Sequence, residues 1–109
     1  MKIENENKQK LVSKEKMYNN AIEEVIGRVK QMEFLMEEVL EILEKCPEYI
    51  QKDEIIARKI AVLEFYQESG QWLSDYECDE RGELPPDLKR GILSEDRLYN
   101  LLCDIKLWR

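Results

Sequence analysis

The chain has 109 residues and a net charge of −7, from 24 Asp and Glu against 17 Lys and Arg, and it contains no histidine. This length suits one domain with one modest core, and the 43% hydrophobic content argues against a disordered chain. The lack of histidine excludes Ser-His-Asp and Cys-His catalytic sites and every zinc site that needs imidazole. With no signal-like start and no long apolar run, we expect a protein that is neither exported nor membrane-spanning.

The cysteines and the charge distribution narrow the function classes further. Cys46, Cys78 and Cys103 form no C-x-x-C pair, and an odd number is not a disulfide framework, so a reducing cytoplasm is the expected location. Residues 1–16 hold five Lys against three Glu, a balance of +2 that leaves −9 for the rest. An acidic body repels nucleic acid and anionic lipid, so we expect neither to be a partner.

The first helix is predicted over about residues 20–45, after a disordered or frayed tail at 1–16. Residues 17–109 are predicted to form a single helical domain. The helix start is ambiguous, because either Asn20 or Ser13 could cap it. Pro47 cannot continue the helix, which should therefore stop near Cys46. Its apolar stripe, at spacings of three and four residues, comprises Ile22, Val25, Ile26, Val29, Met32, Met36, Val39, Leu40 and Leu43.

A second, antiparallel helix is predicted from Asp53 and Glu54, whose negative charge suits a helix start, to Ser69-Gly70, where glycine can end it. Its stripe is Ile56, Ile60, Leu63 and either Tyr66 or Gln67, with Ile55 and Val62 at the edge. The first helix would be about 40 Å long, whereas a compact domain of this size has a radius of gyration of about 13 Å. The long helix must then protrude or pack against something of similar length, which favours a homodimer.

Residues 71–93 contain no long periodic run and are predicted to form an ordered strap across the helices. Within the strap, residues 86–91 resemble a single helical turn, with proline near its start and glycine past its end. Ser94 is expected to cap a last, short helix with Glu95 and Asp96 in its first turn. No segment has a strand period, so the predicted fold is all-α. The last helix should face the core through Leu98, Leu101, Leu102 and Ile105.

The most specific motif of the chain is the string D-L-K-R-G-x-L-S-E-D-x-x-Y from Asp87 to Tyr99. The resemblance that this string carries, to a bacterial family of unknown function, number 4298, spans most of residues 26–109. It is also carried by Tyr66, Gly70, Trp72-Leu73, Asp75-Tyr76-Glu77, Asp79-Glu80, Gly82 and Leu84-Pro85. The resemblance implies a small helical protein of the bacterial cytoplasm with no assigned activity and no catalytic residues to carry over.

Three interpretations of the strap compete. Asp75, Glu77 and Asp79 alternate like early EF-hand ligands, but glycine is missing at the sixth position and glutamate at the twelfth, so we predict no metal site. An enzyme could use Asp75, Asp79 and Glu80 for acid–base chemistry and Lys89 with Arg90 to clamp an anion. Cys78 is a poor nucleophile, since the acidic residues around it should raise its pKa.

In the third interpretation the strap is structural or meets a protein partner. Trp72, Tyr76 and Leu84 would fasten it to the helices, while Lys89 and Arg90 bridge to acidic residues. We favour this interpretation: a non-enzymatic interaction or scaffold module that contacts a protein partner or a second copy through the region of residues 70–96, with no cofactor. A small anionic ligand bound by Lys89, Arg90 and loop carboxylates is the alternative. The candidate residues for contact or ligand binding are Trp72, Asp75, Asp79, Glu80, Lys89, Arg90, Asp96 and Tyr99.

Overall fold

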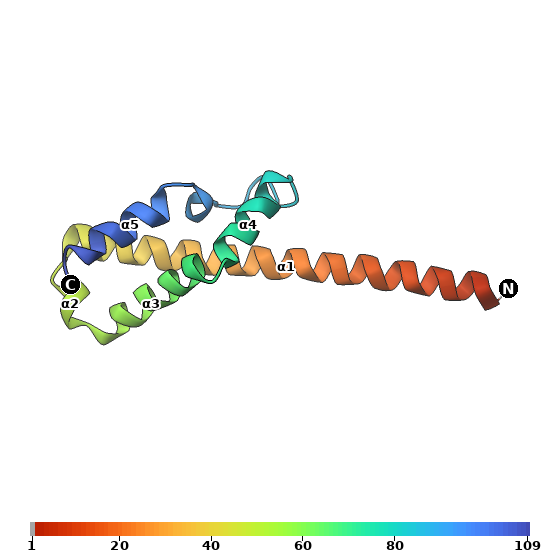
Figure 1. Cartoon of the computed structure of the whole chain (residues 1–109), viewed down its shortest axis with the longest axis horizontal. Coiled ribbons are helices and arrows are strands. Elements are labelled where there is room, and N and C mark those ends of the chain that lie inside the picture. The colour runs from red at the N-terminus through yellow and green to blue at the C-terminus, as the bar shows by residue number, and fades with distance from the viewer. Residues whose placement is uncertain (1) are drawn as a thin grey trace.

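The computed structural model describes the backbone of residues 2–109 and the side chains of residues 14–109. In this part of the chain every regular element is a helix, which confirms the all-α prediction (Figure 1). The elements in chain order are α1 (Lys2–Lys45), α2 (Tyr49–Lys52), α3 (Glu54–Glu68), α4 (Gln71–Glu80), the 3-10 helix η1 (Gly91–Leu93) and α5 (Arg97–Lys106).

Helix α1 is longer than the sequence predicts. It begins at Lys2, so neither Ser13 nor Asn20 starts it, and residues 2–16 continue the same helix. Fraying of these residues in solution stays a prediction. The helix ends at Lys45, as Pro47 requires, with a last hydrogen bond of 2.8 Å from the Cys46 N–H to the Ile42 carbonyl. The N-terminal part of α1 extends beyond all the other elements (Figure 1).

Helices α2 and α3 turn the chain back along α1. The single turn of α2 was not predicted, whereas α3 begins where the acidic pair indicated. The Asp53 side chain accepts hydrogen bonds from the N–H groups of Ile55 (2.8 Å) and Ile56 (3.1 Å), which satisfies the free donors of the first turn. Gly70 takes the left-handed conformation at φ +87° and separates α3 from α4.

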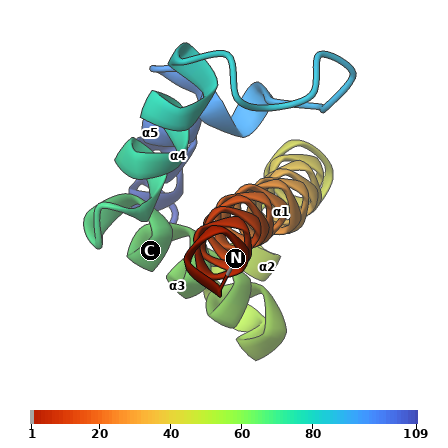
Figure 2. The same cartoon turned by 90° about the vertical axis from the view of Figure 1, so that its right-hand side faces the viewer.

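The predicted strap is partly wrong, because its first ten residues form α4. Only residues 81–90 are an irregular loop, and the turn at its end lies between Pro85 and Leu88 instead of over 86–91 (N–H to carbonyl 3.2 Å). Seen along α1, the loop crosses from α4 towards the far side of α1 (Figure 2). Helix α5 begins at Arg97 with Asp96 at its N-cap, so Glu95 and Asp96 precede the first turn in which they were predicted. The Ser94 Oγ still accepts from the Arg97 N–H at 3.2 Å.

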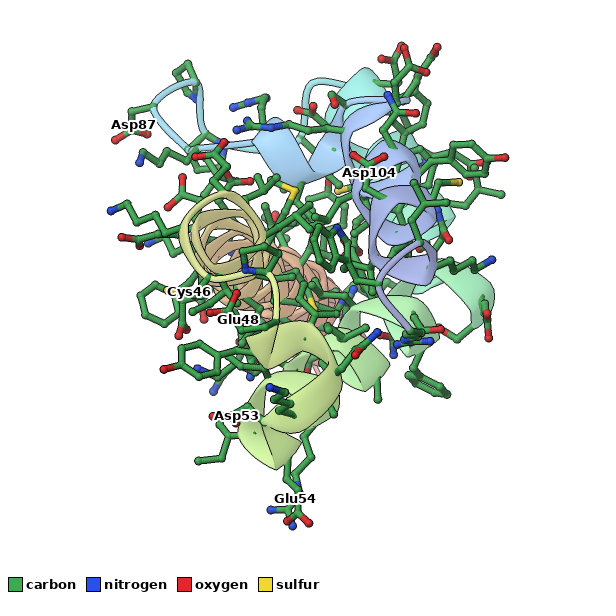
Figure 3. The ribbon with its side chains drawn as sticks, turned by 90° about the vertical axis from the view of Figure 1, so that its left-hand side faces the viewer. Cys46, Glu48, Asp53, Glu54, Asp87 and Asp104 are labelled. Atoms are coloured by element: carbon green, nitrogen blue, oxygen red, sulfur yellow. The ribbon has the colours of Figure 1, made fainter. Side chains whose placement is uncertain are left out.

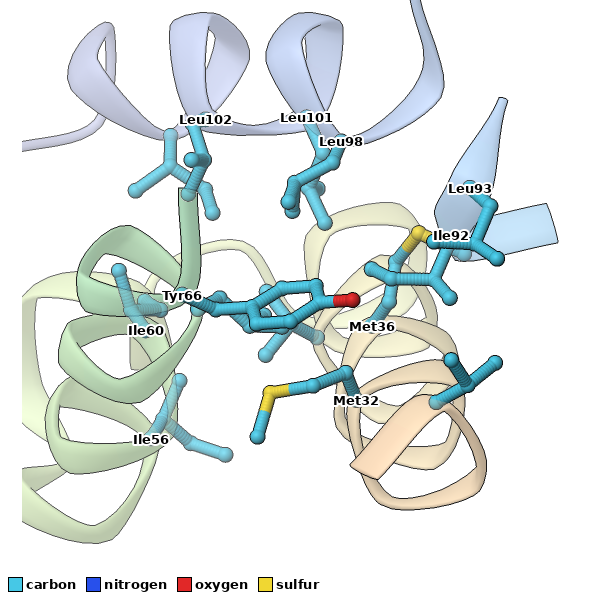
Figure 4. Packing of buried hydrophobic residues seen from close by; sticks show 14 of the residues in the cluster. Met32, Met36, Ile56, Ile60, Tyr66, Ile92, Leu93, Leu98, Leu101 and Leu102 are labelled. Carbon is cyan, nitrogen blue, oxygen red and sulfur yellow. The ribbon is translucent and has the colours of Figure 1, made fainter. Parts of the chain in front are cut away.

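The core lies between α1, α3 and α5. Tyr66 of α3 lies among Met32 and Met36 of α1, facing the leucines of α5 (Figure 4). Of the predicted α1 stripe, only the stretch from Val29 to Val39 is fully covered, whereas Ile22 and Val25 are half-buried. The predicted stripes of α3 and α5 are buried as expected: Ile56, Ile60, Leu63, Tyr66, Leu98, Leu101, Leu102 and Ile105.

Candidate functional site

Asp75 is the centre of a buried polar cluster that joins three helices. Its side chain is 0% exposed. It accepts two hydrogen bonds from Arg28 on α1, at 2.9 Å from Nε and 2.6 Å from a terminal nitrogen, and one of 2.8 Å from the Tyr66 hydroxyl on α3. Burial and the bond to Asp75 raise the pKa of Tyr66, so its hydroxyl stays a donor. These three hydrogen bonds therefore hold α1, α3 and α4 together.

Arg90 organises the loop that follows α4. Its guanidinium contacts the Asp79 carboxylate and the Pro85 carbonyl, and its Nε donates to the Leu88 carbonyl at 3.2 Å. The neighbouring Lys89 is largely exposed, with its Nζ 3.4 Å from the carboxylate of Glu37 on α1. Both cations thus bridge to acidic residues of the same chain, as the structural interpretation predicts.

Trp72 and Tyr76 fasten α4 to the segment before α5. The two rings stack with centroids 5.1 Å apart, and the Trp72 indole donates to the Ile92 carbonyl at 2.7 Å. The Tyr76 hydroxyl donates to Glu95 at 2.8 Å, which raises the pKa of Tyr76 to about 12. Both side chains are half-buried. Their hydrogen bonds join α4 to the segment before α5 and not to the first two helices, as was predicted, although Trp72 also packs against the core.

Two buried polar groups complete this inner network. Glu33 on α1 is buried, and its carboxylate accepts a hydrogen bond from the Ile92 N–H at 2.5 Å. This residue was not among the candidates predicted from the sequence. Its only sequence signal is a charge beside the apolar stripe. Cys78 is buried, and burial, followed by its hydrogen bond to Glu83, raises its pKa to about 11. The direction of the pKa shift agrees with the prediction, but its main causes are burial and Glu83 instead of the adjacent Glu77, Asp79 and Glu80.

The remaining candidates do not join these residues in one site. Glu80, Asp96 and Tyr99 are exposed and lie on α4, before α5 and on α5. No group of three or more Cys, Asp or Glu among the described residues is arranged to hold a metal ion. A groove of about 320 Å³ runs between α1 and the loop, but its two lysines are accompanied by a carboxylate. Its lining is Ile26, Lys30, Pro85, Asp87, Leu88 and Lys89.

The outward face of α3 is the other notable surface. Ile55, Val62 and Phe65 are 62%, 41% and 64% exposed, although all three are large and apolar. The C-terminus lies beside this helix, because Arg109 bonds to Glu64 at 2.6 Å, and it carries the exposed Leu107 and Trp108. We define the outward face as Ile55, Arg58, Ala61, Val62, Phe65 and Glu68, all of them exposed.

Residues 29–107 match the family model described as a domain of unknown function, DUF4298. The chain belongs to this family. Of the buried Asp75 cluster, Tyr66 and Asp75 lie inside the DUF4298 match and Arg28 directly precedes it. No curated protein and no solved structure matches the chain. Within residues 2–109, none of the helices combines the length and the apolar character needed to span a bilayer.

Proposed function

We propose that this DUF4298 protein is a non-enzymatic protein–protein interaction module that uses the outward face of α3 as its contact surface. The observation that carries the proposal is the exposure of Ile55, Val62 and Phe65 on one side of a single helix. Contiguous exposed apolar side chains on a folded protein are typical of contact surfaces. The three cysteines are free, which supports a reducing cytoplasm as the place of action.

The contacts of residues 70–96 support moving the contact surface from the strap to α3. Asp75 and Trp72 are engaged with other parts of the same chain, and so is Arg90. A small anionic ligand would have to displace Glu37 from Lys89 or Asp79 from Arg90. The alternative of an anion-binding protein or enzyme is therefore disfavoured, because its cations already have carboxylate partners.

Site-specific photo-crosslinking in the cells that naturally produce the protein tests this proposal. A photoreactive phenylalanine analogue replaces Phe65, and the matched control places it at Tyr99, an aromatic residue of α5 with similar exposure. We expect one discrete adduct from position 65 and none from position 99. An adduct only from position 99 would instead place the contact surface on α5. If both variants are folded and neither forms an adduct, the proposal is contradicted.

A further inference from the structure

We propose that the partner of this surface is a second copy of the chain, packed through an antiparallel pairing of two α3 helices about a twofold axis. This inference rests on the proposed contact role of α3 and adds the identity and register of the partner. Figure 3 shows Asp53 and Glu54, at the start of α3, at the opposite edge of the molecule from Asp87 on the loop. The residues of the outward face are all exposed, so neither the loop nor α5 covers them.

The outward face has the repeat that an antiparallel helix pair uses. Arg58 and Phe65 are one heptad apart, and Ala61 and Glu68 form a second row with the same spacing. In antiparallel pairs, residues of one row lie level with residues of the other row on the partner. When Phe65 lies over the partner's Ala61, the small side chain leaves room for the ring.

The same register brings opposite charges together. With Phe65 level with the partner's Ala61, Arg58 is level with the partner's Glu68, and the twofold axis repeats this pair at the other end. Arg58 and Glu68 are exposed, and neither forms an ion pair among the described side chains. The register that places Phe65 over the partner's Ala61 therefore also gives Arg58 and Glu68 an oppositely charged partner.

The two flanks of the pair fit as well. Near the axis, Val62 meets Val62 of the partner subunit and extends the apolar layer. On the opposite flank Glu64 would approach its own symmetry mate, which by itself would be repulsive. Arg109 already binds Glu64 at 2.6 Å and neutralises it within each chain. The charge pattern along the whole face is thus compatible with its own copy.

The size of the contact sets the expected strength. A 15-residue helix presents less than the roughly 800 Å² per partner of a standard interface, so the dimer should be weak, with a dissociation constant of about 10 µM to about 1 mM. Light scattering across this range should show the mass rising from 13.1 kDa towards twice that value. A mass of 13.1 kDa at the highest concentration would overturn the inference.

Charge exchange tests the register. Arg58→Glu and Glu68→Arg each place like charges at both ends of the pair, and each should raise the dissociation constant about tenfold. The double variant R58E/E68R restores both pairs within one chain and should return to within about threefold of the wild type. Lys30→Glu and Glu23→Arg make the same charge changes at exposed positions of α1 and should leave the mass curve unchanged.

The outcomes separate this inference from the proposed function. A dimer that ignores both single changes, or that the double variant does not restore, uses another face, and the register is then wrong. A monomeric protein whose position-65 crosslink forms with a chain of a different mass overturns the second copy and leaves the interaction role standing. A monomer without any such crosslink overturns both. Circular dichroism of each variant verifies that it is folded.

Discussion

At the scale of single residues, the buried carboxylate of Asp75 is the group that most needs hydrogen-bond donors from its surroundings. A charge removed from water is tolerated only where donors replace the lost hydration. Arg28 supplies two hydrogen bonds and the positive charge, and Tyr66 supplies a third bond. Because the donors come from α1 and α3 while Asp75 belongs to α4, the cluster fixes the relative placement of three helices.

Graded substitutions at this cluster should separate charge from hydrogen bonding. Asp75→Asn leaves the partly buried Arg28 without its counter-charge and should lower the free energy of unfolding by about 2–4 kcal/mol. Tyr66→Phe removes one hydrogen bond to a charged group and should cost about 1–2 kcal/mol. Asp87→Asn, on the exposed loop, is the matched control and should change little. Urea unfolding measures all three, and a smaller effect for Asp75→Asn than for Tyr66→Phe would contradict the charge argument.

The role of Asp75 shows where residue-level prediction stops. The sequence singled out Asp75 as a candidate ligand or acid–base group because of its acidic neighbours. Its donors lie 47 and 9 positions away, so no local pattern connects them. Trp72, by contrast, was predicted to be an anchor from its residue type alone, and its ring does pack against the core, although its hydrogen bond goes to Ile92 within the predicted strap.

At the scale of elements, the strong apolar periodicities predicted α3 and α5, whereas the same criterion missed α4. The buried side of α4 consists of Asp75 and Cys78, with the half-buried Trp72 beside them. A charged residue in the middle of the buried side breaks the hydrophobic stripe, so the segment resembles a loop in sequence. The single turn of α2 was missed because one turn is too short to show a period.

Glycine-to-alanine substitutions in α1 and in η1 should have opposite effects on stability, because the two glycines have different surroundings. Gly27 lies within α1, and an added Cβ would meet nothing within 4 Å. Gly27→Ala should therefore stabilise the protein by about 0.5–1 kcal/mol, the usual gain for alanine in a helix.

At Gly91, the start of η1, an added Cβ would lie 2.9 Å from a Glu33 carboxylate oxygen and closer still to the Arg97 guanidinium. Arg97 can move aside, but Glu33 is held by its bond to Ile92. Gly91→Ala should cost about 1–2 kcal/mol by weakening that bond. Thermal and urea unfolding compare the stabilities of the two variants. If Gly91→Ala is more stable than the wild type, Glu33 moves to make room for the Cβ without weakening its hydrogen bond to Ile92.

At the scale of the whole molecule, the length of α1 determines the shape. The protein measures 68 × 25 × 21 Å with a radius of gyration of 18.6 Å, against about 13 Å for a compact chain of this size. The sequence predicted that a helix over residues 20–45 must protrude or find a long partner, whereas the part that protrudes is the N-terminal extension, which was predicted to lie outside the helix (Figure 1). The homodimer inferred from the same mismatch stays a prediction, and α3 is the surface now proposed for it.

The projecting arm of α1, residues 2–16, should be the least stable part of the molecule. An isolated helix of this length is marginal in water, because the first turn costs more free energy than its hydrogen bonds return. The amide hydrogens of residues 3–16 should therefore exchange at least about a hundredfold faster than those between Val29 and Val39, which the core covers.

Hydrogen exchange followed by mass spectrometry, at a concentration where light scattering shows the monomer, measures the difference between arm and core directly. The α3 pairing leaves the arm uncovered, so its exchange should stay fast when the concentration is raised and the mass doubles. Slow exchange in the arm of the monomer would contradict fraying. Slowing that accompanies the increase in mass would instead place the arm in the contact between two copies, because only a covering surface can protect amides that the helix alone cannot.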